Sequence, residues 1–241
     1  MNMITHSHTI YKTKVHFLAT LSFIIAPIIF LLIVAQFTSL TVESLFIDFS
    51  TSIFRLLCAY LVAVLLAWSL ALMFATGKYS HFALPVFDVL QSFPTFALVP
   101  LAVLTFGSTN FTVIFFLVIT IIWPILFSTV NALKLIKKEY WEVADIYGLR
   151  GWKRFRYFLL PASIPGIVTG SIIGIGEGWE ALVATEIIMN TKTGLGSFFQ
   201  GNSTDTLLTT LGILSLMFII FSVNRLIWAP ILARVYHRMQ E

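Results

Sequence analysis

Residues 142–161 read EVADIYGLRGWKRFRYFLLP, a polar stretch inside a chain that is otherwise apolar enough for lipid. Of the 241 residues, 58% are hydrophobic and 11% are charged, and the mean hydropathy is +0.93. An average soluble domain carries about 25% charged residues. The composition therefore predicts an integral membrane protein, and we expect the polar stretch to lie outside the bilayer.

The polar stretch itself predicts a short amphipathic helix that ends in a turn. Apolar and aromatic side chains recur at i, i+3, i+4 and i+7, which places them on one face of a helix. These side chains are Tyr140, Val143, Ala144 and Tyr147. Gly148 is placed to end the helix, because glycine readily takes the left-handed conformation found at helix C-termini. Taken alone, the pattern is equally typical of a helix lying on a membrane surface.

Charged residues flank this helix on both sides. Glu139 and Glu142 are expected in its first turn, where the helix dipole favours acids. The side chains of the basic run 150–156 are expected to reach lipid phosphates. Pro161 lies near the start of the next apolar segment, where a helix tolerates proline. The stretch is therefore predicted to return the chain to the membrane at Pro161.

Outward from this stretch, the chain divides into apolar segments separated by short polar breaks. Crossing the hydrocarbon core takes about 20 residues. Segments of this kind lie at about residues 17–37, 52–76, 83–106, 110–133, 158–188 and 207–233. We therefore expect an all-α integral membrane protein, with six transmembrane helices in a single domain over residues 1–241. The first segment is too long for a cleaved signal peptide and is expected to stay as an anchor.

The basic residues of the breaks fall on one side of the predicted membrane. They are Lys12, Lys14, Lys78, Lys134, Lys137, Lys138, Arg150, Lys153, Arg154, Arg156, Arg234 and Arg238. Of the opposite breaks, the first carries Glu43 and Asp48, and the others carry few charges. Because cytoplasmic loops accumulate Lys and Arg, both termini and the polar stretch are expected in the cytoplasm. The same bias explains the net charge of +4, so no nucleic-acid partner is expected.

Three glutamates, Glu177, Glu180 and Glu186, lie inside the apolar segment 158–188. A charge at mid-membrane costs about 2.5–3.5 kcal/mol on insertion scales, so these groups need a role. One interpretation is structural: the acids pair with a buried base such as Arg55, or lie near the outer mouth in water. The other is functional: they line a translocation path and disfavour a bare anion, in which case a cationic or zwitterionic solute fits better.

Two further patterns concern how the apolar segments pack. Pro85, Pro94 and Pro100 predict an interrupted helix whose freed carbonyls face protein or a water-filled path, although an ordinary proline-kinked helix remains the alternative. Gly170 and Gly174 form a small-xxx-small pair, which predicts close helix packing within the chain or across a dimer axis. Arg225 is expected to snorkel towards the cytoplasmic face or to meet an acid.

The spacing of five residues across the polar stretch resembles the EAA loop of ABC importer permeases; they are Glu142, Ala144, Gly148, Leu160 and Pro161. That loop has the pattern E-A-A, three residues, G, nine residues, I, one residue and L-P. Here Val143 stands at the second position, and Phe158 replaces the isoleucine. Both departures are mild.

Other segments are similar to the nitrate, sulfonate, taurine and bicarbonate group of these permeases, over about residues 50–238. They are DVLQSFPTFALVPLAVLTFG at 88–107, EGWEALVATEII at 177–188 and TKTGLGSFFQ at 191–200. Glu186 matches a glutamate that this group carries seven residues after a tryptophan, here Trp179. Glu177 and Glu180 depart from the group, which puts in doubt the transfer of nitrate or sulfonate as substrate.

The resemblance implies a type I ABC importer permease fold in a bacterial cytoplasmic (inner) membrane, with a cytoplasmic coupling helix in the loop at about 137–157. The five EAA-loop residues would dock on a separate ATPase, which hydrolyses ATP, since no G-x-x-x-x-G-K-S/T loop occurs in this chain. An extracytoplasmic solute-binding protein and a second permease copy, as a homodimer, complete the expected assembly. The candidate path residues are Pro94, Pro100, Trp179, Glu177, Glu180 and Glu186.

No catalytic residue, cofactor or metal site is expected in this chain. Its single cysteine, Cys58, lies in an apolar segment, and no Cys/His cluster has metal-ligand spacing. Two other classes remain as alternatives: a secondary transporter that works without ATP, and an intramembrane enzyme built on His16, His81 or His237. The EAA spacing favours the permease over both.

Overall fold

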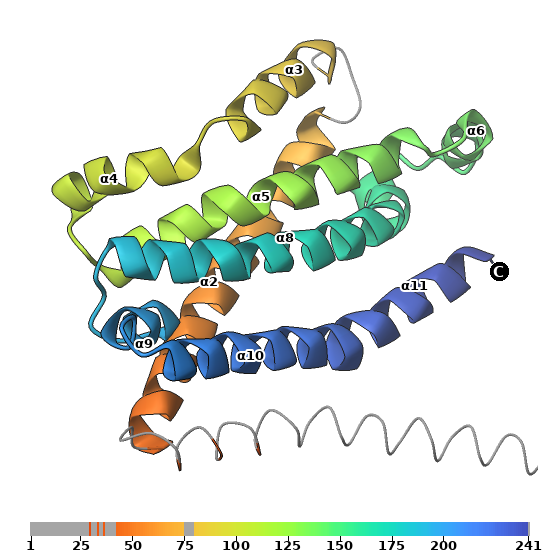
Figure 1. The fold of residues 1–241 in the computed structure, drawn as a ribbon. Coiled ribbons are helices and arrows are strands. Elements are labelled where there is room, and N and C mark those ends of the chain that lie inside the picture. The colour runs from red at the N-terminus through yellow and green to blue at the C-terminus, as the bar shows by residue number, and fades with distance from the viewer. Residues whose placement is uncertain (1–28, 30–32, 34–35, 37–41, 75–79, 241) are drawn as a thin grey trace, which may run out of the picture.

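The computed structural model describes residues 42–74 and 80–240, together with the single positions 29, 33 and 36 (Figure 1). The expected span at 17–37 falls outside the described residues apart from those three positions, so six spans remain a prediction. The basic residues Lys12, Lys14 and Lys78 also lie outside the described ranges.

In the described ranges every regular element is a helix, which confirms the all-α class. The elements are α2 (Val42–Phe74), α3 (Ser80–Gln91), η1 (Thr95–Leu98), α4 (Val99–Phe106), α5 (Asn110–Lys134), α6 (Lys138–Ile146), α7 (Trp152–Arg154), η2 (Phe155–Leu159), α8 (Leu160–Ile188), α9 (Leu195–Gly201), α10 (Thr206–Val223), η3 (Asn224–Trp228) and α11 (Ala229–Gln240). Of the η elements, η1 is a 3₁₀ helix and η2 and η3 are π-helices.

Four helical stretches of the described chain are long and apolar enough to cross a membrane, and a bent pair makes five if it counts as one span. The four are Glu43–Phe74, Asn110–Lys134, Trp152–Ile188 and Thr206–Val235, and the pair is Phe82–Gln91 with Thr95–Phe106. Each contains most of one expected segment. The largest difference is α2, which begins at Val42 rather than near residue 52. No glycine or proline interrupts residues 42–52, so Glu43 and Asp48 join the helix.

The centre of the bundle is the pair α5 and α8, which lie side by side and antiparallel, with α2 crossing behind them (Figure 1). Small residues allow this approach. A Cβ on Gly170 would lie 2.5 Å from Ile125 Cα, and one on Gly174 would lie 3.1 Å from the Ile121 carbonyl oxygen. The predicted small-xxx-small contact is therefore confirmed, and it is made within one chain.

The third expected segment is broken near Pro94, as predicted, whereas Pro85 lies inside α3 without interrupting it. α3 ends at Gln91, and the helices on the two sides of the break differ in direction by 70°. Pro94 has no backbone N–H and disfavours helical geometry at the residue before it, and its own carbonyl accepts from Ala97 N at 2.9 Å. Pro100 lies at the start of α4, where a helix tolerates it. Both prolines are exposed.

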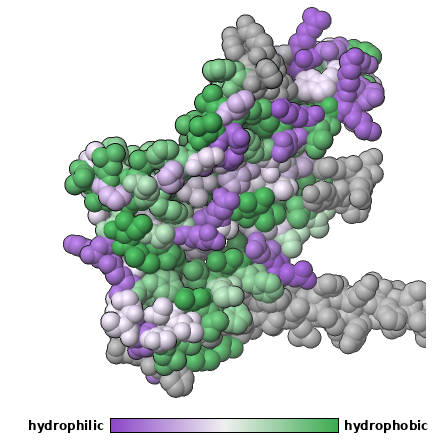
Figure 2. All heavy atoms as spheres, turned by 45° about the horizontal axis from the view of Figure 1, so that its top comes forward, coloured by the Kyte–Doolittle hydropathy of each residue, from purple (hydrophilic) through white to green (hydrophobic). Residues whose placement is uncertain are grey.

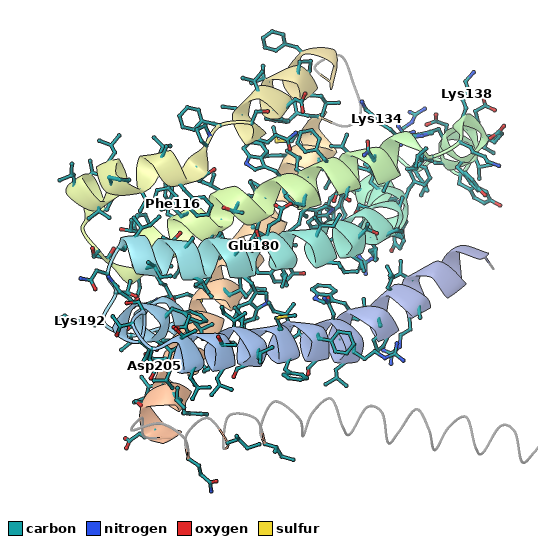
Figure 3. All side chains as sticks on the ribbon, viewed as in Figure 1. Phe116, Lys134, Lys138, Glu180, Lys192 and Asp205 are labelled. Atoms are coloured by element: carbon teal, nitrogen blue, oxygen red, sulfur yellow. The ribbon has the colours of Figure 1, made fainter. Side chains whose placement is uncertain are left out.

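Different helices lie at the two ends of the bundle. The helix α6 and the C-terminal end of α11 lie at one end, and α9 lies at the other (Figure 1). Lys138 and Lys192 mark these two ends in Figure 3. The shared end of α6 and α11 agrees with the expected topology, in which the polar stretch and the C-terminus lie on one side of the membrane.

Candidate functional site

The polar stretch folds as α6, a turn at Gly148 and the short α7. Leu149 N donates to the Ala144 carbonyl at 2.9 Å, and Gly148 N donates to the Asp145 carbonyl at 3.0 Å. This is the hydrogen-bond pattern of a Schellman C-cap. Gly148 has φ +66°, as predicted, while a Cβ at this position would meet nothing within 4 Å. Glycine is therefore favoured here for its backbone conformation and not for lack of space.

The predicted apolar face of α6 is divided between solvent and the chain itself. Tyr140, Val143 and Tyr147 are exposed, Tyr147 at 79%. Ala144 is 2% exposed, so it packs against this chain. Periodicity places a residue on a helix face, but it does not say which neighbour covers that face.

The other residues of the EAA pattern lie on both arms of this hairpin. Because α6 begins at Lys138, Glu139 is in its first turn as expected but Glu142 is not. Glu142 is instead exposed and pairs with Lys138 at 3.7 Å. Leu160 and Pro161 begin α8, with Pro161 exposed and Leu160 half-buried.

Sequence reasoning missed the role of Arg154, which it grouped with the lipid-facing basic run. In the structure its side chain turns back to α6. Arg154 Nε donates to the Leu149 carbonyl at 3.0 Å, its Nη2 forms an ion pair with Asp145 Oδ1, and its Cζ lies 5.9 Å from the Trp141 ring centroid. The sequence did carry a signal for this contact, because Asp145 and Arg154 have opposite charges and lie on the two sides of the turn at Gly148.

A groove of about 680 Å³ lies between the C-terminal part of α5 and the N-terminal part of α8, next to α6. Its lining includes the polar residues Ser128, Asn131 and Thr169, and also Pro161. Figure 2 shows hydrophilic side chains gathered at the α6 end of the molecule and a smaller hydrophilic group in the middle of an otherwise hydrophobic face.

A buried polar cluster lies at the end of the bundle opposite α6. Arg55 Nη1 donates to Glu186 Oε1 at 2.6 Å, and Ser52 Oγ lies 2.9 Å and 3.0 Å from the two carboxylate oxygens. Arg55 is 5% exposed, and Ser52 and Glu186 are 0% exposed. A buried ion pair is tolerated only where further hydrogen bonds satisfy both charges. The predicted pairing with Arg55 is therefore confirmed for Glu186.

Two glycines, Gly194 and Gly196, let the backbone at the start of α9 approach the Glu186 carboxylate. Gly196 N donates to Glu186 Oε2 at 2.9 Å. A Cβ on Gly196 would overlap the Glu186 side chain, and a Cβ on Gly194 would lie 2.6 Å from both carboxylate oxygens. Gly194 also has φ +126°, which other residues rarely adopt. The GLG sequence at 194–196 is thus explained by its contact with Glu186.

The same cluster joins four parts of the chain. Arg55 Nη2 donates to Asn110 Oδ1 at 2.6 Å, at the start of α5, and Arg55 Nη1 donates to the Thr193 carbonyl at 2.9 Å. Asp48 Oδ1 accepts from Gly194 N at 2.8 Å. Glu186, in α8, is therefore buried in the helix packing of one chain, and Trp179 is also buried, at 4% exposed; neither side chain is open to the surface in this structure.

Glu177 and Glu180 lie elsewhere on α8 and are both exposed (Figure 3 labels Glu180). In the part of the chain that the structure describes, neither forms an ion pair, so the expected pairing with Arg55 does not extend to them. Arg225, also exposed, has no ion-pair partner among the described residues. Helical spacing puts Thr169, Ile173 and Glu180 on one face of α8, and this face continues the groove.

Comparison with known proteins gives consistent matches. Residues 59–235 match the family described as "Binding-protein-dependent transport system inner membrane component". The nitrate import permease protein NrtB of Leptolyngbya laminosa is 33% identical over 159 residues, which cover 66% of this chain and 57% of that protein.

Two further relatives are similar to this chain. The bicarbonate transport system permease protein CmpB of Synechococcus elongatus is 31% identical over 157 residues, 65% of this chain and 56% of that protein. The taurine transport system permease protein TauC of Escherichia coli is 28% identical over 137 residues, 55% of this chain and 50% of that protein. The chain thus spans only a little over half the length of the first relatives.

Proposed function

Since this chain belongs to the family of binding-protein-dependent transport system inner membrane components, we propose that it is the permease subunit of an ATP-driven importer. It forms part of the path for a small solute, and a separate ABC ATPase supplies the energy. The exposed face of α6 carries this proposal: Tyr140, Val143 and Tyr147 are exposed, and α6 lies at one end of the bundle (Figure 1).

An exposed amphipathic helix suits docking in a groove of another protein. The covalent path from α6 to the membrane is short, because the span Trp152–Ile188 begins only a few residues after the Gly148 turn. Closure of the ATPases on ATP would therefore displace α6 and tilt α8. This places Glu142, Ala144, Gly148, Leu160 and Pro161 in the coupling element, with Ala144 packing α6 onto its own chain.

The solute path follows the exposed face of α8. Two carboxylates in a membrane span are too costly to face lipid, so Glu177 and Glu180 face an aqueous path that a second copy of the chain completes about a two-fold axis. The groove at Thr169 continues the path towards the α6 end. The break at Pro94 and the exposed Pro100 are proposed to border it.

The surroundings follow from this arrangement. The membrane is a bacterial cytoplasmic membrane, with α6 and both termini in the cytoplasm. Exposed basic residues at the α6 end, such as Arg150 and Lys153, lie where lipid phosphates are. A solute-binding protein delivers the solute at the α9 end. Nitrate, bicarbonate and taurine are substrates named for the relatives; in this chain the exposed carboxylates oppose an unaccompanied anion.

The test is affinity purification from host membranes in mild detergent, with ATP hydrolysis assayed on the eluate. Val143→Asp places one acid on the exposed face of α6, and Thr204→Asp places one at an exposed position at the other end of the bundle. We expect an ATPase to copurify with the wild type and with Thr204→Asp, but not with Val143→Asp. If no variant brings down an ATPase and transport proceeds without ATP, the secondary-transporter alternative is correct.

A further inference from the structure

We propose that Arg154 is a positioning residue that fixes α6 to the start of the α8 span, so that a displacement of α6 moves α8 as one body. The inference rests on the proposed function, because it concerns how the ATPase-docking helix is joined to the membrane part. The group formed by Arg154, Asp145, Trp141 and the Leu149 carbonyl is called the Arg154 clamp.

One guanidinium holds three separate parts of the hairpin. Its Nε donates to the Leu149 carbonyl at 3.0 Å, just beyond the turn. Its Nη2 pairs with Asp145, in the last turn of α6. Its plane lies beside Trp141, in the middle of α6, at 5.9 Å from Cζ to the ring centroid. A planar fork of donors is suited to several simultaneous contacts of this kind, whereas a lysine ammonium is not.

The clamp is anchored to the bundle on its membrane side. Trp141 packs edge-on against Phe158, with ring centroids 4.9 Å apart. Phe158 lies in the π-helix η2, and in the same helix the Phe155 ring centroid lies 5.6 Å from the Trp68 ring centroid of α2. Trp68 Nε1 also donates to Ser163 Oγ at 2.9 Å, in the first turns of α8. A continuous set of contacts therefore runs from α6 through η2 to α2 and α8.

Without the clamp, the backbone joining α6 to α7 is a turn with a glycine at each end. Gly148 and Gly151 have φ +66° and +51°, and a Cβ on either would meet nothing within 4 Å. At these two positions the turn is therefore not packed against other atoms, and glycine has wide backbone freedom. Such a turn can bend when α6 is pushed. The side-chain contacts of Arg154 oppose that bending, and this is why we assign it the positioning role.

The variants are chosen to separate Arg154 from general charge effects. Arg154→Ala removes the clamp, and Arg154→Lys keeps the charge but not the fork. Lys153→Ala is the matched control, because this neighbouring cation is exposed and its side chain makes no ion pair in the described chain. In hydrogen–deuterium exchange of the detergent-purified protein, we expect Arg154→Ala to speed exchange across residues 138–149 about tenfold, as local opening becomes easier. Lys153→Ala should leave exchange unchanged.

The second measurement follows α8 in the copurified complex with its ATPase, reconstituted in lipid nanodiscs. A reporter cysteine at Ile173, on the exposed face of α8, is introduced in a Cys58→Ala background. A membrane-impermeant maleimide then reports its accessibility with and without ATP plus vanadate. We expect the labelling rate to depend on nucleotide in the wild type and in Lys153→Ala. In Arg154→Ala, we expect ATP still to be hydrolysed while the labelling rate no longer depends on nucleotide. In Arg154→Lys, the dependence of the labelling rate on nucleotide should lie between those of the wild type and Arg154→Ala.

The outcomes distinguish the two levels of the proposal. Unchanged exchange in Arg154→Ala overturns the clamp. Faster exchange with nucleotide-dependent labelling intact shows a merely structural contact and overturns the positioning role. If the ATPase copurifies with every variant except Arg154→Ala, Arg154 acts in docking, and the positioning role is overturned as well. Absence of an ATPase from the wild-type eluate instead contradicts the proposed function, and the coupling role of Arg154 with it.

Discussion

At the scale of single residues, Glu186 shows how a charge can be held inside a membrane protein. Its carboxylate receives hydrogen bonds from Arg55, Ser52 and Gly196 N. Ser52 and Arg55 lie one turn apart on α2 and Gly196 lies in α9, and these groups replace the water that Glu186 loses. The carboxylate therefore serves to join helices at one end of the bundle and is not available to a solute.

The first prediction concerns this ion pair. Glu186→Ala leaves the Arg55 guanidinium buried without its counter-charge, and breaking a buried pair in this way costs about 3–5 kcal/mol. The double change Arg55→Met with Glu186→Leu removes both charges and is expected to lose less than Glu186→Ala alone. Thermal unfolding of the purified protein in detergent compares the variants. Equal or greater loss in the double variant would contradict the assignment.

The second prediction concerns the glycine that approaches Glu186. Gly196→Ala adds a Cβ that overlaps the Glu186 side chain, so α9 has to move away. Overpacking of this kind costs about 1–3 kcal/mol, which a lower unfolding temperature would show. Gly201→Ala, at the other end of α9, meets nothing within 4 Å and is the control. Similar unfolding temperatures for both variants would mean that the backbone approach is not needed.

At the scale of elements, apolar length and proline position predicted the described spans well. The break before η1 follows from local chemistry, because Pro94 has no backbone N–H and disfavours helical geometry at the residue before it. Which neighbour covers each helix face does not follow from local chemistry. The same periodicity that grouped Ala144 with Tyr147 could not tell which of them packs inward. Likewise, the clamp at Arg154 requires knowing how tightly the hairpin folds back.

The third prediction tests the helix pair at the centre of the bundle. In Gly170→Ala the new Cβ lies 2.5 Å from Ile125 Cα, so α5 and α8 must separate. We expect a loss of about 1–3 kcal/mol of stability, seen as earlier unfolding and aggregation in detergent. Gly176→Ala, on the same helix, meets nothing within 4 Å and should be neutral or slightly stabilising. A neutral Gly170→Ala would show that the two helices are not held this closely.

At the scale of the whole molecule, the two ends of the bundle have different construction. The α9 end is held by buried hydrogen bonds that join helices distant in sequence. The α6 end is held by side chains that are partly exposed, Arg154 at 30% among them. In the proposed function, the less buried α6 end is the one that moves with the ATPase.

The fourth prediction locates the aqueous path. In a Cys58→Ala background, Glu180→Cys is expected to react with a membrane-impermeant maleimide in reconstituted vesicles. Leu65 is also exposed in a single chain but lies on α2 in an apolar stretch, and Leu65→Cys should stay unlabelled because this position faces lipid. Reaction at both positions, or at neither, would contradict a path along α8.

The Arg55–Glu186 pair also bears on how the chain is made. Its members are separated by 131 positions, so the ribosome completes α2 long before α8 exists. During that interval Arg55 lies in a newly inserted helix without a counter-charge, a state that water or the insertion machinery has to accommodate. The counter-charge arrives only when Glu186 has been made, so a chain truncated before Glu186 keeps Arg55 without its partner.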